Sequence, residues 1–164
     1  MSIGYIDFDG KIKGNSQDEN HKEWIEVSMV SQGVNRNINP SSKPDKALST
    51  SQVQVGAITI QKNADQSSPE LVSAVCEGKT FGKVTIDLVK VSPNGNEVFY
   101  QWELKDAYIA SYDMHGAGHG GIEVNETISI CYSTIKWSYK PTGADGSAGT
   151  PVDTGWDLIA NKTN

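Results

Sequence analysis

The sequence predicts a mainly β protein, either a small antiparallel β-barrel or a two-sheet sandwich, with one short α-helix. Three observations predict this fold class. Most apolar residues recur at every second position, which is typical of strands with one buried face. Turn-forming residues separate these runs, and a single segment has the apolar spacing of a helix. Periodicity does not distinguish a barrel from a sandwich, so both architectures stay open.

The first strands are expected at residues 3–8, 24–34 and 53–62. In the second of these, Ile25, Val27 and Met29 alternate with polar residues. In the third, the apolar phase changes at Gly56 and Ala57. An extra residue in one strand shifts the side-chain phase, so a β-bulge is predicted at this point.

The helix is expected to begin at Ser68. This serine suits the N-cap, Pro69 suits the first helical position, and Glu70 places an acid in the first turn. Apolar residues then follow at helical spacing. Gly78 supplies the residue type that commonly ends a helix.

The second half of the chain is expected to contain a hairpin and a long final strand. Residues 84–88 and 98–104 alternate on either side of the turn at 93–96, which predicts two antiparallel strands. The later run 122–140 changes phase between Ile130 and Ile135, which predicts a second bulge.

The chain is interpreted as one domain, residues 1–164, because its 164 residues are enough to bury a hydrophobic core. Two segments lack core periodicity. Residues 35–52 are expected to form an extended loop, and residues 141–164 a C-terminal tail.

Composition excludes several classes of function. The formal net charge of −6 and the lack of a basic cluster argue against nucleic-acid binding. The apolar runs are too short for a transmembrane helix, so no membrane insertion is expected. The N-terminus lacks the basic start and apolar stretch of a signal peptide, so any export would move the folded protein through dedicated machinery.

No convergent catalytic, cofactor-binding or metal-binding set stands out, so the chain is not expected to be an enzyme and no cofactor is expected. His115 and His119 are spaced like metal ligands on a helix, but the glycines around them disfavour a helix. His21 is expected to be an exposed polar residue. Cys76 and Cys131 are expected to be small buried hydrophobic residues.

Several strings resemble a known family in their order and spacing around the single helix. They are Tyr5-Ile6-Asp7-Phe8-Asp9-Gly10-Lys11-Ile12-Lys13-Gly14, His21-Lys22-Glu23-Trp24-Ile25-Glu26-Val27, Lys62 to Asp65, Ser67-Ser68-Pro69-Glu70-Leu71, Ile135-Lys136-Trp137-Ser138-Tyr139 and Gly155 to Lys162. The chain is thereby similar to the haemolysin-coregulated proteins (Hcp), the tube proteins of the bacterial type VI secretion system.

The resemblance implies a β-barrel-like protomer that forms a homo-hexameric ring. Such rings would stack into a hollow tube that works with the sheath and spike of the secretion apparatus and carries effector proteins in its lumen. The subunit would be cytoplasmic before assembly and then secreted from a Gram-negative bacterium without a cleaved signal peptide.

Two surfaces are candidates for these contacts. Exposed strand edges and the aromatic residues Trp102, Tyr108 and Tyr112 could join neighbours within a ring. The four residues Lys43, Pro44, Asp45 and Lys46 are the predicted ring-stacking loop, and the alternative is a loop that only faces solvent.

A second hypothesis from another functional class is a monomeric β-sandwich that binds carbohydrate or peptide. Its candidate stacking platforms are the four tryptophans, Trp24, Trp102, Trp137 and Trp156. The same residues are also interpreted as core and rim residues.

Overall fold

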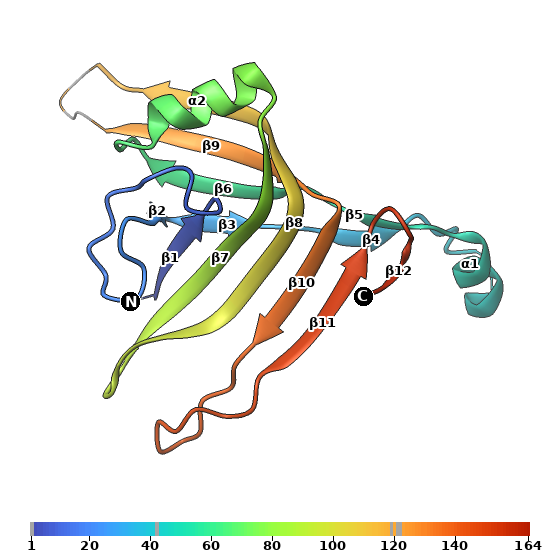
Figure 1. Ribbon diagram of the computed structural model, residues 1–164. Helices are drawn as coiled ribbons and strands as arrows, with labels where there is room; N and C mark the ends of the chain where they lie inside the picture. Colours follow the sequence, from blue (N-terminus) through green and yellow to red (C-terminus); the bar gives the residue numbers. More distant parts are fainter. Residues whose placement is uncertain (1, 42, 119, 121–122) are drawn as a thin grey trace.

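The computed structural model describes residues 2–41, 43–118, 120 and 123–164. Within these residues it contains twelve strands and two helices (Figure 1). The strands are β1 (Ser2–Asp7), β2 (Ile25–Val27), β3 (Met29–Ser31), β4 (Val34–Arg36), β5 (Val53–Val55), β6 (Ile58–Asn63), β7 (Thr80–Ser92), β8 (Gly95–Gly116), β9 (Val124–Cys131), β10 (Thr134–Tyr139), β11 (Val152–Asp157) and β12 (Lys162–Thr163). The helices are α1 (Pro44–Thr50) and α2 (Ser68–Glu77).

Ten strands form one antiparallel sheet that folds into two layers joined by β8. One layer has the order β12-β11-β10-β8-β7-β1-β2. The other layer consists of β3, β6, β9 and residues 108–116 of β8, and we call it the four-stranded layer. The long strand β8 belongs to both because it pairs with β10 along residues 100–105 and with β9 from Tyr108 onward.

The two layers are also connected by the consecutive strands β2 and β3, which are separated only by Ser28. β2 pairs with β1, whereas β3 pairs with β6. The Ser28 amide continues this ladder by donating to the Gln61 carbonyl over 2.7 Å. The pairings therefore lead from β1 through β2–β3, β6, β9, β8 and β7 back to β1. This barrel-like arrangement of a mainly β chain confirms the predicted fold class.

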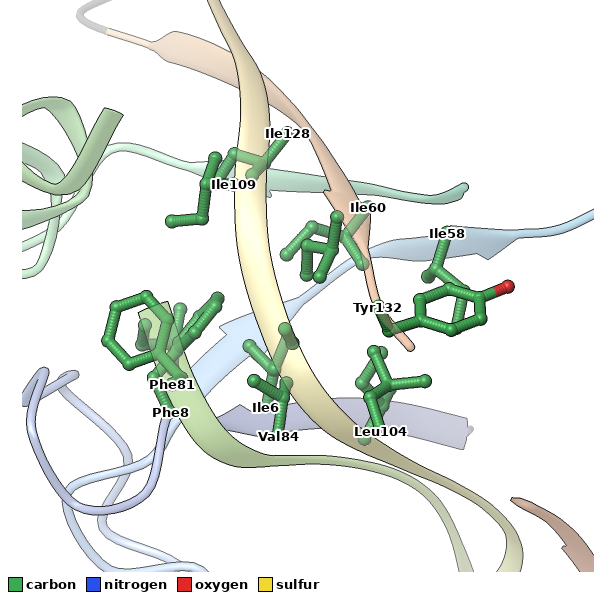
Figure 2. Packing of buried hydrophobic residues seen from close by; sticks show 14 of the residues in the cluster. Ile6, Phe8, Ile58, Ile60, Phe81, Val84, Leu104, Ile109, Ile128 and Tyr132 are labelled. Atoms are coloured by element: carbon green, nitrogen blue, oxygen red, sulfur yellow. The ribbon is translucent and has the colours of Figure 1, made fainter. Parts of the chain in front are cut away.

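The core fills the space between the layers. Figure 2 shows Ile6, Val84 and Leu104 of one layer beside Ile60 and Ile128 of the other. All five side chains are fully buried. Strands present alternate residues to opposite faces, so the period-two pattern of the sequence places these residues in the core. Helix α2 covers one end of the core with Leu71 and Ala74.

The predicted helix and hairpin are both confirmed. α2 spans Ser68–Glu77, so the N-cap residue is Ser67 and not Ser68, and Pro69 is the second helical residue. The helix ends where Gly78 adopts a left-handed conformation at φ 65°. The amides of Gly78 and Lys79 donate to the Val75 and Ala74 carbonyls, so glycine closes the last turn as expected. Strands β7 and β8 pair from Thr80↔Tyr108 to Ser92↔Gly95.

In the described part of the chain, neither predicted β-bulge is present at its predicted position. The change in the apolar phase has a different cause in both places. The first lies between β5 and β6, which belong to different sheets. The second lies between β9 and β10, which pair with different stretches of β8. In each case the chain leaves one partner and takes another, so the side-chain phase is reset without an inserted residue.

Three other expectations are corrected. Residues 24–34 form parts of three strands instead of one, since the chain changes partner twice. The extended loop 35–52 contains the end of β4 and the helix α1, so the structure has two helices and not one. The tail 141–164 contains β11 and β12, which continue the larger layer. No helix among the described residues is both long and apolar enough to cross a membrane.

Candidate assembly interfaces

The four-stranded layer has an open edge on each side. On one side, β3 pairs only with β6 among the described residues. On the other, β7 stops pairing at Tyr108, so β8 continues from residue 109 to 116 with β9 as its only strand partner in the described chain. Main-chain groups on such edges can pair with another chain. Met29 and Met114, which are 53% and 61% exposed, add an apolar side chain to each edge.

The face of this layer that points away from the core is polar and nearly uncharged. Its residues alternate with the buried isoleucines of β6 and β9. Two cross-strand rows run over it, Ser31–Thr59–Ser129–Ser111 and Met29–Gln61–Thr127–Asp113. The Thr59 and Ser129 hydroxyl oxygens lie 3.5 Å apart. Hydroxyl and amide groups therefore dominate this face, with Asp113 as the charged member of these rows.

Residues 34–55 form a projection that we call the arm. It consists of β4, α1 and β5, and it extends away from the barrel in Figure 1. Strands β4 and β5 pair with each other in a separate two-stranded sheet. The arm also exposes apolar side chains, because Val34, Ile38 and Leu48 are 53%, 47% and 53% exposed.

The predicted stacking residues lie at the start of α1 within the arm. Lys43 is the N-cap residue, Pro44 is the first helical residue and Asp45 is the acid of the first turn. Lys43, Pro44, Asp45 and Lys46 are all exposed. These residues therefore form the first turn of a helix and not a loop. At the first helical position an N–H has no partner within the helix, so proline is well suited there. The negative charge of Asp45 interacts favourably with the positive end of the helix dipole.

Arg36 of β4 holds the other end of α1. Its Nη1 atom donates to the Ser51 carbonyl at 2.8 Å and to the Leu48 carbonyl at 3.4 Å. The last carbonyls of a helix lack partners within the helix and carry partial negative charge. The last turn of α1 has no basic residue of its own, so the guanidinium from the neighbouring strand supplies both the donor and the positive charge.

A chain of side-chain hydrogen bonds fixes the base of the arm to the barrel. Trp137 Nε1 donates to Gln32 Oε1 at 2.8 Å, and Gln32 Nε2 donates to the Tyr132 hydroxyl at 2.6 Å. That hydroxyl donates to the Gly56 carbonyl at 2.6 Å. Gln32 precedes the arm and Gly56 follows it, so both ends of the arm are held. Burial raises the pKa of Tyr132 to about 12, which keeps the hydroxyl proton available.

His21 is buried, so its predicted exposure is wrong. Its Nδ1 atom lies 2.8 Å from Asp18 Oδ1 and its Nε2 atom 3.0 Å from Asp87 Oδ2. The ring stacks on Tyr5, with centroids 4.5 Å apart. Burial lowers the pKa of His21, but the hydrogen bonds and charges of Asp87 and Asp18 outweigh burial and raise it overall. The cluster ties the segment after β1 to the outer side of β1 and β7.

A second buried cluster lies beneath the start of α2. Lys62 Nζ is 2.6 Å from Glu126 Oε2 and 3.0 Å from Asp65 Oδ1. The Tyr112 hydroxyl donates to the other Glu126 oxygen. Burial raises the pKa of Glu126, but its bonds to Lys62 and to neighbouring hydroxyls lower it overall. A fully buried lysine is thus compensated by two carboxylates, which makes this cluster structural.

The remaining candidate residues have mixed outcomes. Cys76 is exposed on α2, which contradicts its predicted burial, and Cys131 is partly buried. Trp102, Trp137 and Trp156 pack partly buried against the core. His115 is exposed near the end of β8, while His119 lies outside the described residues. Within the part of the chain that the structure describes, no group of three His, Cys, Asp or Glu side chains could hold a metal.

Comparison with known proteins gives consistent relationships. A family model described as "Type VI secretion system effector, Hcp" matches residues 5–139. Protein hcp1 of Pseudomonas aeruginosa is 27% identical over 153 residues, covering 93% of each chain. A solved "Structure of a type six secretion system protein" is similar over the whole of both chains, with 28% identity and a TM-score of 0.92. Hcp1 from Salmonella typhimurium shares the fold, with 24% identity, 99% coverage of each chain and a TM-score of 0.77.

Proposed function

Because the chain belongs to the Hcp family of type VI secretion tube proteins, we propose that it is a ring-forming subunit whose rings stack into a hollow tube. The role is structural and concerns transport, not catalysis. The observation that carries the proposal is the four-stranded layer with its two open edges.

Two different edges on opposite sides of one layer suit a head-to-tail contact. If β3 of one protomer pairs with the 109–116 edge of its neighbour, the contact is heterologous and can close into a ring. Each closure satisfies the main-chain groups that both edges leave open. We propose six protomers per ring, which is the number that the family resemblance implies.

The same geometry favours one face of the layer as the wall of the lumen. One face is covered by the core of its own protomer, so in an edge-to-edge ring the bulk of every protomer must lie outside. The polar face with the rows Ser31–Thr59–Ser129–Ser111 and Met29–Gln61–Thr127–Asp113 would then face inward. A hydroxyl-rich and amide-rich wall suits the passage of effector proteins that are held by weak, reversible hydrogen bonds.

The arm supports a second, axial contact. It projects beyond the barrel, and Lys43, Pro44, Asp45 and Lys46 lie exposed on its helix. A heterologous contact that does not close generates an open stack. We therefore propose that the arm joins successive rings. The subunit would assemble in the cytoplasm with its sheath and spike and leave the cell folded, through the apparatus.

The ring is tested by light scattering on a size-exclusion column, with negative-stain imaging of the peak. The expected mass is near six times the 17.7 kDa of one chain, with annular particles. Met114→Lys places a charge on the open edge and should convert the ring to monomers while the fold stays intact, because Met114 is 61% exposed.

Val91→Lys is the matched control, because Val91 is 68% exposed at the far end of the β7–β8 hairpin. It should leave the ring mass unchanged. A wild-type monomer at high concentration would overturn the ring, and an intact Met114→Lys ring would overturn the assigned edge.

A further inference from the structure

The arm has a counterpart at the opposite end of the same strands. The arm leaves the barrel after β3 and returns into β6, so it lies at the end where β3 stops and β6 starts. At the other end, where β3 starts and β6 stops, a hollow of about 550 Å³ lies between Ser28 and Asn63–Asp65. Figure 1 shows α1 and the arrowhead of β6 at opposite sides of the molecule.

The hollow combines an apolar part with an acidic one. Its lining includes Ile3, Val27 and Ala64 together with the carboxylates of Glu26 and Asp65. None of the residues that line it is basic. Asp65 is already bonded to Lys62 at 3.0 Å. Glu26 is exposed, so it is the carboxylate best placed to meet an incoming cation.

The arm has the complementary chemistry. Residues 34–55 contain three basic residues and one acidic residue, whereas the whole chain has a formal net charge of −6. The arm is therefore a basic element on an acidic protein. It also offers Ile38 and Leu48, which are 47% and 53% exposed, to an apolar surface. Opposite charges on two contacting surfaces favour the correct pairing and disfavour others.

We propose that this hollow is the receptor site for the arm of a second copy of the chain in the next ring, with Lys43 and Lys46 directed to Glu26. The inference rests on the proposed stacking of rings and names the surface that receives the arm. Because arm and hollow lie at opposite ends of the β3–β6 pair, one copy cannot satisfy its own hollow. Repetition of this contact extends a column without closing it.

A carbodiimide tests the contact directly, because it joins a carboxylate to an amine only when the two touch. Concentrated wild-type protein is treated, separated by size, and digested for mass spectrometry. The expected product is an amide between Glu26 and Lys43 or Lys46, in particles larger than one ring. Rings that cross-link through Lys43 to other carboxylates, but never to Glu26, would overturn the receptor site and leave the ring proposal standing.

Charge exchange gives an independent test. Lys43→Glu with Lys46→Glu should form rings that no longer stack, and so should Glu26→Lys. An equal mixture of the two kinds of ring should stack again, because every arm then meets a hollow of opposite charge. Glu77→Lys, the same charge change at the end of α2, should stack like wild type.

The outcomes separate the two proposals. Stacking that survives both charge reversals, or a mixture that fails to stack, contradicts the receptor site even when every variant has the mass of a ring. A wild-type monomer would instead contradict the ring itself.

Discussion

His21 lies between two carboxylates, and this geometry makes the stability of the protein depend on pH. Both ring nitrogens can donate to Asp18 and Asp87 only when the imidazole is doubly protonated, since carboxylates accept. The pKa of His21 is raised in the folded state. Its stabilising contribution is therefore complete below the unfolded-state pKa of about 6.5 and is lost as the pH rises through the higher folded-state pKa.

We expect the free energy of unfolding in urea to fall as the pH rises from about 6.5 through the raised folded-state pKa of His21. His21→Gln should lower it by about 1–3 kcal/mol at the acidic end and flatten the dependence. His115→Gln, at an exposed histidine, should keep the wild-type slope. A stability that rises with pH in the wild type would contradict the protonated state.

Single residues were the hardest feature to predict from sequence. His21 sits among polar neighbours, and its burial depends on Asp87, which is 66 residues away. Cys76 follows apolar residues on α2, but the buried stripe of this helix consists of Leu71 and Ala74. Local pattern does not reveal which side of a short helix the rest of the chain covers.

At the scale of elements, the base of the arm depends on one hydroxyl group. Tyr132→Phe removes the link between Gln32 and the Gly56 carbonyl. We expect a loss of about 1–3 kcal/mol, because buried polar partners are left unsatisfied. Hydrogen exchange should also quicken in residues 34–55 more than in β7. Tyr108→Phe, at a tyrosine that is 47% exposed, should change neither quantity. Unchanged exchange in the arm would contradict the anchoring role.

The sequence predicted those elements whose turn residues, caps and apolar spacing all lie within a short stretch of the chain. The β7–β8 hairpin is determined by alternation around a short turn, and α2 by its proline, its apolar spacing and Gly78. The sequence did not predict the helix α1, because seven residues with mainly exposed side chains give no apolar periodicity. Its C-terminal end is held by Arg36 of β4, a contact that the local sequence does not reveal. Strands β4 and β5 pair outside the barrel, so no buried face gives them a clear period.

At the scale of the whole molecule, the two proposed contacts should respond differently to salt. In the proposed assembly, the arm and the hollow would attract through exposed charges, whereas the ring would be joined by main-chain pairing. Raising the ionic strength from about 0.05 M to 0.5 M screens exposed charges strongly. Sedimentation velocity should show fewer stacked species and an unchanged ring. Loss of the ring before loss of the stacks would reverse this assignment.

The fold class and family were accessible from sequence because strings along most of the chain occur in a consistent order around one helix, and the family match spans residues 5–139. The interfaces were accessible only in outline. An open edge is defined by which strands do not pair, and the hollow by the meeting of Ile3, Glu26 and Asn63. Both features arise only when distant strands pair in the folded sheet, so no short stretch of the sequence reveals them.

The position of the arm also determines how the protein resists being pulled. Because the arm is attached to β3 and β6 at the same end, tension on it acts along these strands instead of peeling them sideways. The six residue pairs between β6 and β9 would then share the force in shear, and the β1–β2 ladder would share it through Ser28. Hydrogen bonds loaded in this way must rupture together, so the attachment of the arm would resist a pull along the axis of a column of such subunits.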